Sequence, residues 1–300
     1  MKERIQRFIQ AFRMNGEVKK KTLIIGAIAL AVIAAIILLA CLSPKQPDKA
    51  DTPDDSVITD KDEEQVDADE PIVEPEDMRT TMEKYPDVYA WIEIPGTAAI
   101  LGTNADVSYP VAQHPTNRNF YVDHDLDGNY SKTGTLFTEA EVEGMKANSL
   151  NFDDPVTIIY GHNMANRSMF GGMQTYANKL DLKEDQPVYI YQKDRRLTYQ
   201  IVGSMMYDST HILYYHDFAN TEPGSAAGVT QGEEVFDNFF KSLWSGDYAD
   251  THVNADNIPV HGDKVLILLT CDNDTSNDNY RYLVICKLVE DTAENKTAAK

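Results

Sequence analysis

The sequence predicts a mainly β domain, an eight-stranded barrel with an N-terminal helix and inserted helices, which follows one transmembrane helix. Three observations lead to this fold class. One stretch near the N-terminus is apolar throughout, eight short β-branched and aromatic runs follow residue 80, and clusters of Gly, Asn and Asp separate those runs. About 210 residues remain after the stretch and its linker, which is enough for a single hydrophobic core.

Residues 22–42 form the predicted transmembrane helix. These 21 residues carry no charge, and about 20 apolar residues suffice to cross a bilayer as a helix. Residues 1–21 hold seven Lys or Arg against Glu3 and Glu17, so this tail is expected in the cytoplasm and the remainder outside the cell. Leu-Leu-Ala-Cys at 38–41 also resembles a lipobox, which leaves lipidation of Cys41 after cleavage as an alternative anchor.

Residues 43–79 are predicted to be an acidic, disordered stalk. The formal net charge is −21, and residues 51–80 alone hold thirteen Asp or Glu against Lys61 and Arg79. A segment with such charge and few aromatics repels itself and cannot form a core. Because no basic face replaces phosphate counterions, nucleic-acid binding is disfavoured. The folded domain is expected at 80–292, before a disordered tail at 293–300.

The predicted elements of the folded domain are mostly strands. Three helices are expected: 78–85, which Pro86 ends, 168–177, which begins at a Ser cap, and 233–244, which places four aromatic or aliphatic residues on one face. Strands 156–160 and 264–270 are apolar on both faces, which places them centrally in the sheet. The eight predicted strands are 89–94, 107–113, 134–137, 156–160, 188–191, 198–206, 264–270 and 282–289.

Cys271 ends one central strand and is the candidate nucleophile, because a strand end is a rigid platform beside a polar loop. A reactive thiol needs a base or cation nearby. His162 follows the other central strand, and Arg281 stands ten residues after Cys271 at the start of the next strand. Cys286 lies within an alternating strand and is expected in the core. The remaining six His are interpreted as solvated: His114, His124, His211, His216, His252 and His261.

Residues 123–128, Asp-His-Asp-Leu-Asp-Gly, match the first half of a calcium-binding EF-hand loop. Position twelve of that loop would be Gly134, where a bidentate Glu is required, and no flanking helices are indicated. The segment is therefore interpreted as an acidic turn. No metal and no cofactor are expected.

Several stretches together resemble the sortase family, and class B in particular. Besides the order His162, Thr270-Cys271 and Arg281, the similar stretches cover roughly residues 80–290. They are Tyr-Ala-Trp-Ile-Glu-Ile-Pro-Gly-Thr at 89–97, Tyr-Pro-Val-Ala-Gln at 109–113, Asn-Phe-Tyr at 119–121, Tyr-Gly-His-Asn-Met at 160–164 and Ser-Met-Phe at 168–170.

This resemblance implies a sortase-type barrel and a cysteine transpeptidase, related to cysteine proteases, at the surface of a Gram-positive cell. Cys271 would attack the threonyl carbonyl of a C-terminal sorting signal and form a thioester. His162 would protonate the leaving amine, and Arg281 would hold the substrate or its oxyanion. An amine would then resolve the thioester. The implied partners are a secreted surface protein or a pilin, and a cell-wall peptide or lysine amine as acceptor.

The chain departs from the family pattern beside the nucleophile. Ile267-Leu268-Leu269-Thr270-Cys271 stands where the family commonly has Thr-Leu-Ser/Thr-Thr-Cys. Leu269 and Thr270 are candidate substrate-binding residues, and Leu269 shares a strand face with Cys271. Asp272 or Asp274 would orient Arg281, and the sequence does not choose between them.

Two other functions are alternatives to a sortase. A cell-wall L,D-transpeptidase has Gly before its Cys and Arg two residues after it, whereas this chain has Thr270 and Asn273. A surface lipoprotein that binds a ligand without catalysis is the other alternative, and the lipobox-like residues 38–41 motivate it.

Overall fold

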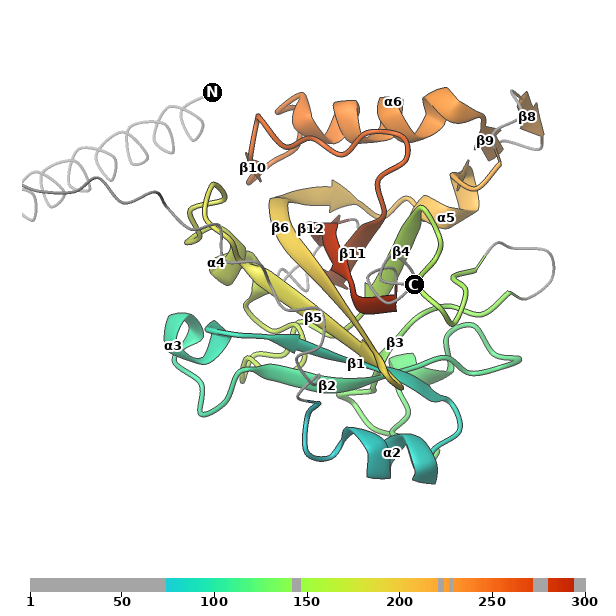
Figure 1. Cartoon of the computed structure of the whole chain (residues 1–300), viewed down its shortest axis with the longest axis vertical. Helices are drawn as coiled ribbons and strands as arrows, with labels where there is room; N and C mark the ends of the chain where they lie inside the picture. Colours follow the sequence, from blue (N-terminus) through green and yellow to red (C-terminus); the bar gives the residue numbers. More distant parts are fainter. Residues whose placement is uncertain (1–73, 142–146, 221–223, 227–228, 272–279, 294–300) are drawn as a thin grey trace, which may run out of the picture. The chain divides into compact units, whose positions relative to one another are not determined.

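The computed structural model describes residues 74–141, 147–220, 224–226, 229–271 and 280–293 (Figure 1). The predicted cytoplasmic tail, transmembrane helix, most of the stalk and the end of the C-terminal tail lie outside these residues. Within the described ranges, no helix combines the length and the apolar character that crossing a membrane requires. Residues 74–77 lead into the first described helix, α2 (Met78–Lys84), which includes the last two residues of the predicted stalk.

Eight strands close into a barrel. Their order around it is β6, β12, β11, β4, β3, β2, β1 and β5, and β5 pairs again with β6. The β4–β11 and β2–β3 pairs are parallel and the other pairs are antiparallel. The bounds are β1 Val88–Ile94, β2 Val107–Ala112, β3 Leu136–Phe137, β4 Val156–Tyr160, β5 Pro187–Gln192, β6 Arg195–Asp208, β11 Val265–Cys271 and β12 Tyr280–Asp291.

All eight predicted strands are present, and the eight-stranded barrel is confirmed. Strands β6 and β12 are longer than predicted, because they pair with each other along almost their whole length. Strand β12 begins at Tyr280, so Arg281 is its second residue and lies at the start of the strand, as predicted. Small additions were not predicted: β10 (His252–Val253) pairs with β6, and β7 (His216–Asp217), β8 (Gly224–Ala226) and β9 (Val229–Gln231) form a separate sheet.

Two hydrophobic cores lie on the two faces of the barrel wall. Every barrel strand contributes to the inner core, which α3 (Thr97–Leu101) and α4 (Met173–Ala177) complete. The outer core lies between the barrel and α6 (Glu233–Trp244), which runs along one side of it (Figure 1). Alternate residues of β4 and β11 therefore enter different cores, which explains why these strands are apolar on both faces.

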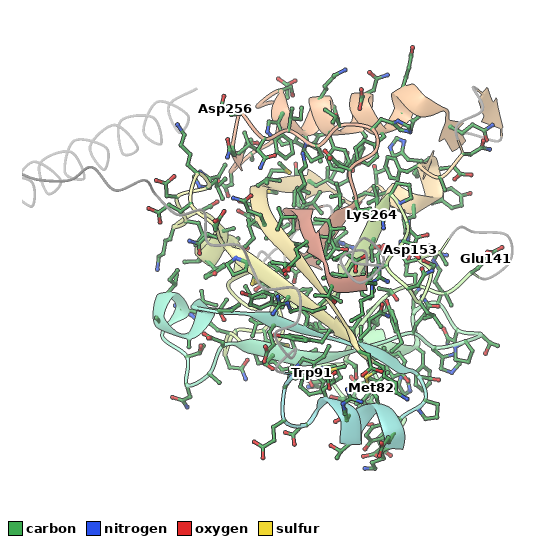
Figure 2. All side chains as sticks on the ribbon, viewed as in Figure 1. Met82, Trp91, Glu141, Asp153, Asp256 and Lys264 are labelled. Atoms are coloured by element: carbon green, nitrogen blue, oxygen red, sulfur yellow. The ribbon has the colours of Figure 1, made fainter. Side chains whose placement is uncertain are left out.

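The helices partly match the expected ones. Helix α6 has the predicted bounds, and α2 differs only at its last residue; Met82 of α2 lies beside Trp91 of β1 (Figure 2). The helix predicted at 168–177 was wrong in its first half. Met169 and Gly172 have positive φ angles, 55° and 82°, which a right-handed helix excludes, so α4 begins only at Met173.

Candidate active site

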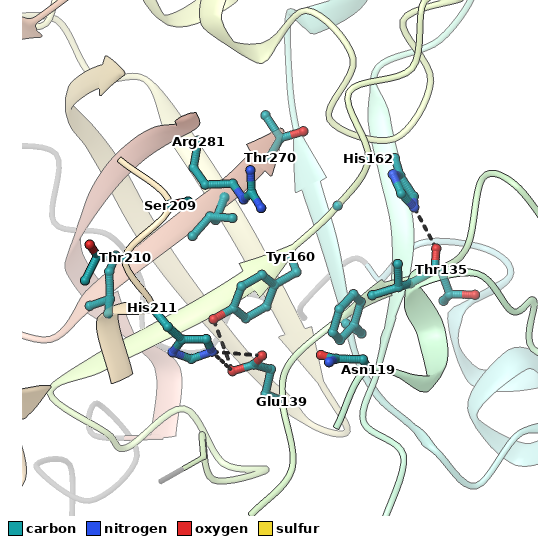
Figure 3. Close-up of a pocket in the computed structure, with 15 residues that line it drawn as sticks. Asn119, Thr135, Glu139, Tyr160, His162, Ser209, Thr210, His211, Thr270 and Arg281 are labelled. Carbon is teal, nitrogen blue, oxygen red and sulfur yellow. Dashed lines mark hydrogen bonds and ion pairs between the residues drawn. The ribbon is translucent and has the colours of Figure 1, made fainter. Parts of the chain in front are cut away.

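A pocket of about 270 Å³ lies at the carboxyl ends of β4 and β11 (Figure 3). These strands are parallel neighbours, so the residues that follow them meet at one edge of the barrel. The other walls come from η1 (Phe120–Val122), from β3 and from the segment before α5 (Ile212–Tyr215). The lining residues are Asn119, Val122, Thr135, Phe137, Glu139, Tyr160, Gly161, His162, Ser209, Thr210, His211, Ile212, Leu269, Thr270 and Arg281.

The β11–β12 pairing places Cys271 directly opposite Arg281. Opposite residues of an antiparallel pair occupy the same face of the sheet, with Cβ atoms about 4.5–5.5 Å apart. The Arg281 side chain lines the pocket, and one of its Nη atoms donates a 2.9 Å hydrogen bond to the Tyr280 carbonyl. The register thus brings together two residues that are ten positions apart in the sequence.

Leu269 and Thr270 form the part of the pocket wall next to Cys271. Leu269 belongs to the outer core and is 9% exposed, so it contributes an apolar surface to the wall. Thr270 is 3% exposed, and its hydroxyl has no hydrogen-bond partner among the described residues. Beside the backbone of Cys271, the pocket is therefore apolar on one face of β11.

His162 is brought to the pocket by a tightly packed turn after β4. The Gly161 N–H donates to the Leu269 carbonyl at 3.0 Å, which extends the pairing with β11 by one residue. A side chain at Gly161 would collide with Leu136 and with Phe170, whose Cδ2 would be 2.6 Å from the added Cβ. The Phe170 N–H closes the turn by donating to the His162 carbonyl at 3.1 Å.

The imidazole of His162 is fixed by one hydrogen bond. Its Nε2 lies 2.6 Å from the Val122 carbonyl oxygen (Figure 3). A carbonyl only accepts, so Nε2 carries the proton in this bond. In this tautomer of the neutral imidazole, the other ring nitrogen, Nδ1, is a hydrogen-bond acceptor.

The structure thus places four of the five predicted site residues, His162, Leu269, Thr270 and Arg281, around one pocket. The backbone of Cys271 ends β11 at the same place, while its side chain is outside the described part of the structure. Asp272 and Asp274, the two candidates for orienting Arg281, also lie outside the described residues. Cys286 is fully buried inside the barrel, as expected, and burial raises the pKa of its thiol.

A buried ionic cluster at the other end of the pocket was not predicted. The Glu139 carboxylate accepts from Arg118 at 2.6 Å, from His211 Nε2 at 2.8 Å and from the Tyr160 hydroxyl at 3.2 Å. Glu139 and Arg118 are 4% and 8% exposed. A buried charge is tolerated when it is paired and hydrogen-bonded, and each oxygen of this carboxylate has at least one such partner.

The hydrogen bonds of this cluster define its protonation. His211 begins α5, where its Nδ1 accepts from the Tyr214 N–H at 3.2 Å, so Nε2 is the nitrogen that donates to Glu139. Burial, and then the adjacent Glu139 carboxylate, raise the pKa of Tyr160 well above its usual value. Tyr160 is therefore a neutral phenol, which donates to Glu139 and forms the centre of the pocket floor (Figure 3).

Sequence reasoning interpreted His211 as solvated, and that interpretation was wrong because Glu139 holds this side chain in the pocket wall. Glu139 is 21 residues from Arg118 and 72 residues from His211. No local pattern connects residues so far apart. The available signal was Glu139 itself, a carboxylate two residues after the short strand β3, with only Thr138 between them.

Comparison with known proteins is consistent with this geometry. No protein-family model matches the chain. It is 24% identical to Sortase B of Listeria monocytogenes over 71% of this chain and 74% of that protein, and 22% identical to Sortase B of Staphylococcus aureus over 68% and 71%. The crystal structure of Clostridium perfringens sortase B matches 71% of this chain and 99% of that one, with 25% identity and a TM-score of 0.50.

The chain is similar to class B sortases in sequence and in fold. Sortases are cysteine transpeptidases, and the similarity identifies this protein as an enzyme of that type whose barrel matches the sortase fold. A Staphylococcus aureus sortase B–substrate complex, 18% identical with a TM-score of 0.50 over 71% of this chain, shares the fold. The pocket at the ends of β4 and β11 is the candidate active site of this enzyme.

Proposed function

We propose that this enzyme is anchored to the outer face of the cell membrane and cleaves a C-terminal sorting signal after Thr. It transfers the acyl group to an amine of the cell wall or of a pilin. The observation that carries the proposal is the meeting of His162 and Arg281 in one pocket at the end of β11, where the register sets Cys271 opposite Arg281.

The reaction has two steps in this proposal. The Cys271 thiolate attacks the threonyl carbonyl, and the Arg281 guanidinium donates to the oxygen that becomes negative. His162 gives its proton to the leaving amine as the C–N bond breaks, and a thioester remains. The acceptor amine then attacks the thioester and gives up a proton to His162, so that an amide forms and the Cys271 thiolate returns.

The chemistry of the pocket also bears on the substrate. Leu269 makes the wall beside the nucleophile apolar, while Tyr160 and His211 present polar groups farther along. Together with Thr270 they form the proposed binding surface for the sorting signal. The secreted surface protein or pilin that carries this signal approaches from outside, because residues 22–42 hold the enzyme in the membrane with its N-terminus in the cytoplasm.

Acyl-enzyme formation tests this function directly. The full-length protein in detergent is incubated with a panel of peptides that contain Thr followed by a short tail, and intact-mass and peptide mapping follow. We expect one acyl adduct on Cys271, its absence in Cys271→Ala, and its retention in the matched variant Cys286→Ala. An unmodified Cys271 across the whole panel would contradict the proposal.

The roles of the two partners are tested by His162→Ala and Arg281→Ala. Each is expected to reduce transpeptidation at least about 10³-fold while the circular dichroism spectrum is unchanged, because each removes a proton donor or a charge-stabilising group. His252→Ala, at a histidine on β10 that is bound to the Leu180 carbonyl, is the control. Activity retained in either site variant would refute its role.

The form of the membrane anchor is tested separately from catalysis. Cys41→Ser should leave the protein in the membrane fraction and leave its mass unchanged apart from the substitution, as a transmembrane helix requires. Release of the protein, or loss of a lipid mass, would establish the lipidated form instead. The similarity to two sortases argues against the non-catalytic lipoprotein.

A further inference from the structure

The Val122 carbonyl, which accepts a hydrogen bond from His162, belongs to a segment whose backbone is closely packed against Gly134. We call residues 119–124 the strap; it contains η1 and crosses one side of the pocket. Tyr121 anchors it, because this side chain is 4% exposed and its hydroxyl donates to Asp87 at 2.8 Å. The next residue, Val122, supplies the carbonyl that accepts from His162 Nε2.

Gly134 and Thr135 contact the backbone of the strap. The Thr135 N–H donates to the Tyr121 carbonyl at 3.0 Å, and its hydroxyl donates to the His124 carbonyl at 3.1 Å. Gly134 has φ 55° and lies directly against the same backbone. A Cβ added at Gly134 would be 2.5 Å from the Val122 oxygen and 2.9 Å from its carbonyl carbon, and it would also collide with the Tyr121 oxygen.

A Cβ at Gly134 would collide with backbone atoms of Tyr121 and Val122, and rotation of a side chain does not relieve such a collision. Real Cβ contacts essentially never fall below 3.0 Å, and ordinary contact begins near 3.4 Å. Any side chain at Gly134 would therefore move the Val122 carbonyl by roughly an ångström. That displacement is comparable with the precision that proton transfer requires of a catalytic group.

We propose that Gly134 and the Val122 carbonyl are positioning residues that hold His162 as the Nε2–H tautomer. This leaves Nδ1 as the nitrogen that exchanges a proton with the leaving amine and with the acceptor amine. Gly134 acts only through the strap and touches no substrate. The effect of Gly134 on catalysis rests on the proposed function of His162. The assignment of the Nε2–H tautomer does not depend on that function.

The chain contains a matched control for the Gly134 substitution. Gly128, in the same connection between η1 and β3, has φ 78°, yet an added Cβ would have only the Phe120 ring edge nearby, at 4.0 Å. Both Gly→Ala variants carry the strain of a left-handed backbone, but only Gly134→Ala displaces the strap. The difference between the two variants therefore isolates the displacement of Val122.

The tautomer is measured on full-length protein labelled with ¹⁵N-histidine. Long-range ¹H–¹⁵N spectra at alkaline pH distinguish Nε2–H from Nδ1–H, and His162→Gln identifies the signal. We expect Nε2–H in the wild type and in Gly128→Ala, and a mixture of tautomers in Gly134→Ala. An Nδ1–H tautomer in the wild type would overturn the proposal, even if Gly134→Ala did not fold.

Kinetics provide the second readout, with circular dichroism as a check of folding. Gly134→Ala is expected to lower kcat about 10- to 100-fold with KM changed less than about threefold, because the peptide-binding wall is retained while the proton-transfer group moves. Gly128→Ala should stay within about threefold of the wild type. Equal kcat values for the two folded variants would refute the positioning role. If no peptide acylated the wild type but Nε2–H were found, the proposed function would fail and the tautomer assignment would stand.

Discussion

At the scale of single residues, the pocket combines one half-buried histidine, His162, with a buried ionic cluster. His162 needs only one accepting carbonyl, so the rest of its ring stays available for chemistry. Glu139 is instead surrounded by the donors Arg118, His211 and Tyr160. The first arrangement suits a group that exchanges protons, and the second suits a fixed wall.

The first prediction concerns the buried pair. Glu139→Gln leaves the Arg118 guanidinium buried without its counter-charge, so we expect the free energy of unfolding to fall by about 3 kcal/mol in urea titrations. The control is Asp127→Asn, because the Lys84–Asp127 pair is exposed on both sides and separated by 3.6 Å. It should cost less than about 1 kcal/mol. Equal losses would show that Glu139 has no special structural role.

At the scale of elements, α6 determines how one face of the barrel is covered. Its Phe236, Phe239, Phe240 and Leu243 all point into the outer core, against β4 and β11, the strands that lead to the active site. The positions of His162 and of the Cys271 backbone therefore depend on the packing of α6 against β4 and β11. The position of His162 also depends on the strap. This core was expected from the aromatic residues at helical spacing.

The second prediction tests that packing. Phe240 is fully buried, so Phe240→Ala should lower the free energy of unfolding by about 3–5 kcal/mol in urea titrations, through lost burial and a cavity under the helix. Lys241→Ala, at an exposed neighbour whose ion pair with Asp237 spans 3.8 Å, should change it by less than about 0.5 kcal/mol. A small effect of Phe240→Ala would mean that α6 is not an integral part of the domain.

At the scale of the whole domain, ion pairs stabilise the long β6–β12 pairing at the end that is remote from the pocket. Arg195 of β6 binds Asp291 of β12 at 2.6 Å and Asp153, in the loop before β4, at 3.1 Å. Asp153 also lies near Lys264, just before β11 (Figure 2). Burial alone would raise the pKa of Asp291, but hydrogen bonds from Arg195 and from the Ala293 N–H lower it below 3.8.

The third prediction follows from the sign of that shift. A carboxyl group whose pKa is lowered by folding binds fewer protons in the folded state, so its contribution to stability is present above about pH 4. That contribution is lost as pH falls through the lowered value. The stability difference between the wild type and Asp291→Asn should therefore be largest near pH 7 and shrink below pH 4. A difference that stayed constant down to pH 2 would contradict this assignment.

Much of the fold was predictable because its signals are local. The alternation and β-branched content of each strand depend on that strand alone, and so does the apolar stripe of α6. The helix at 168–177 was mispredicted because the left-handed backbone of Met169 is set by packing of the turn after His162, which propensity does not reveal. Contacts between segments far apart in the sequence cannot be predicted from a local pattern. The strap, the Glu139 cluster and the role of Gly134 all depend on such contacts.

The sequence by itself determined the strands, because each strand depends on one short local segment. For the same reason it determined the two central strand ends, at His162 and Cys271, and the candidate Arg281. Tertiary structure decided that β4 and β11 are parallel neighbours and that Cys271 pairs with Arg281. It also decided that Val122, in a segment 40 residues before His162, holds the imidazole. The physical reason is that strand register and close backbone packing depend on the closed barrel as a whole.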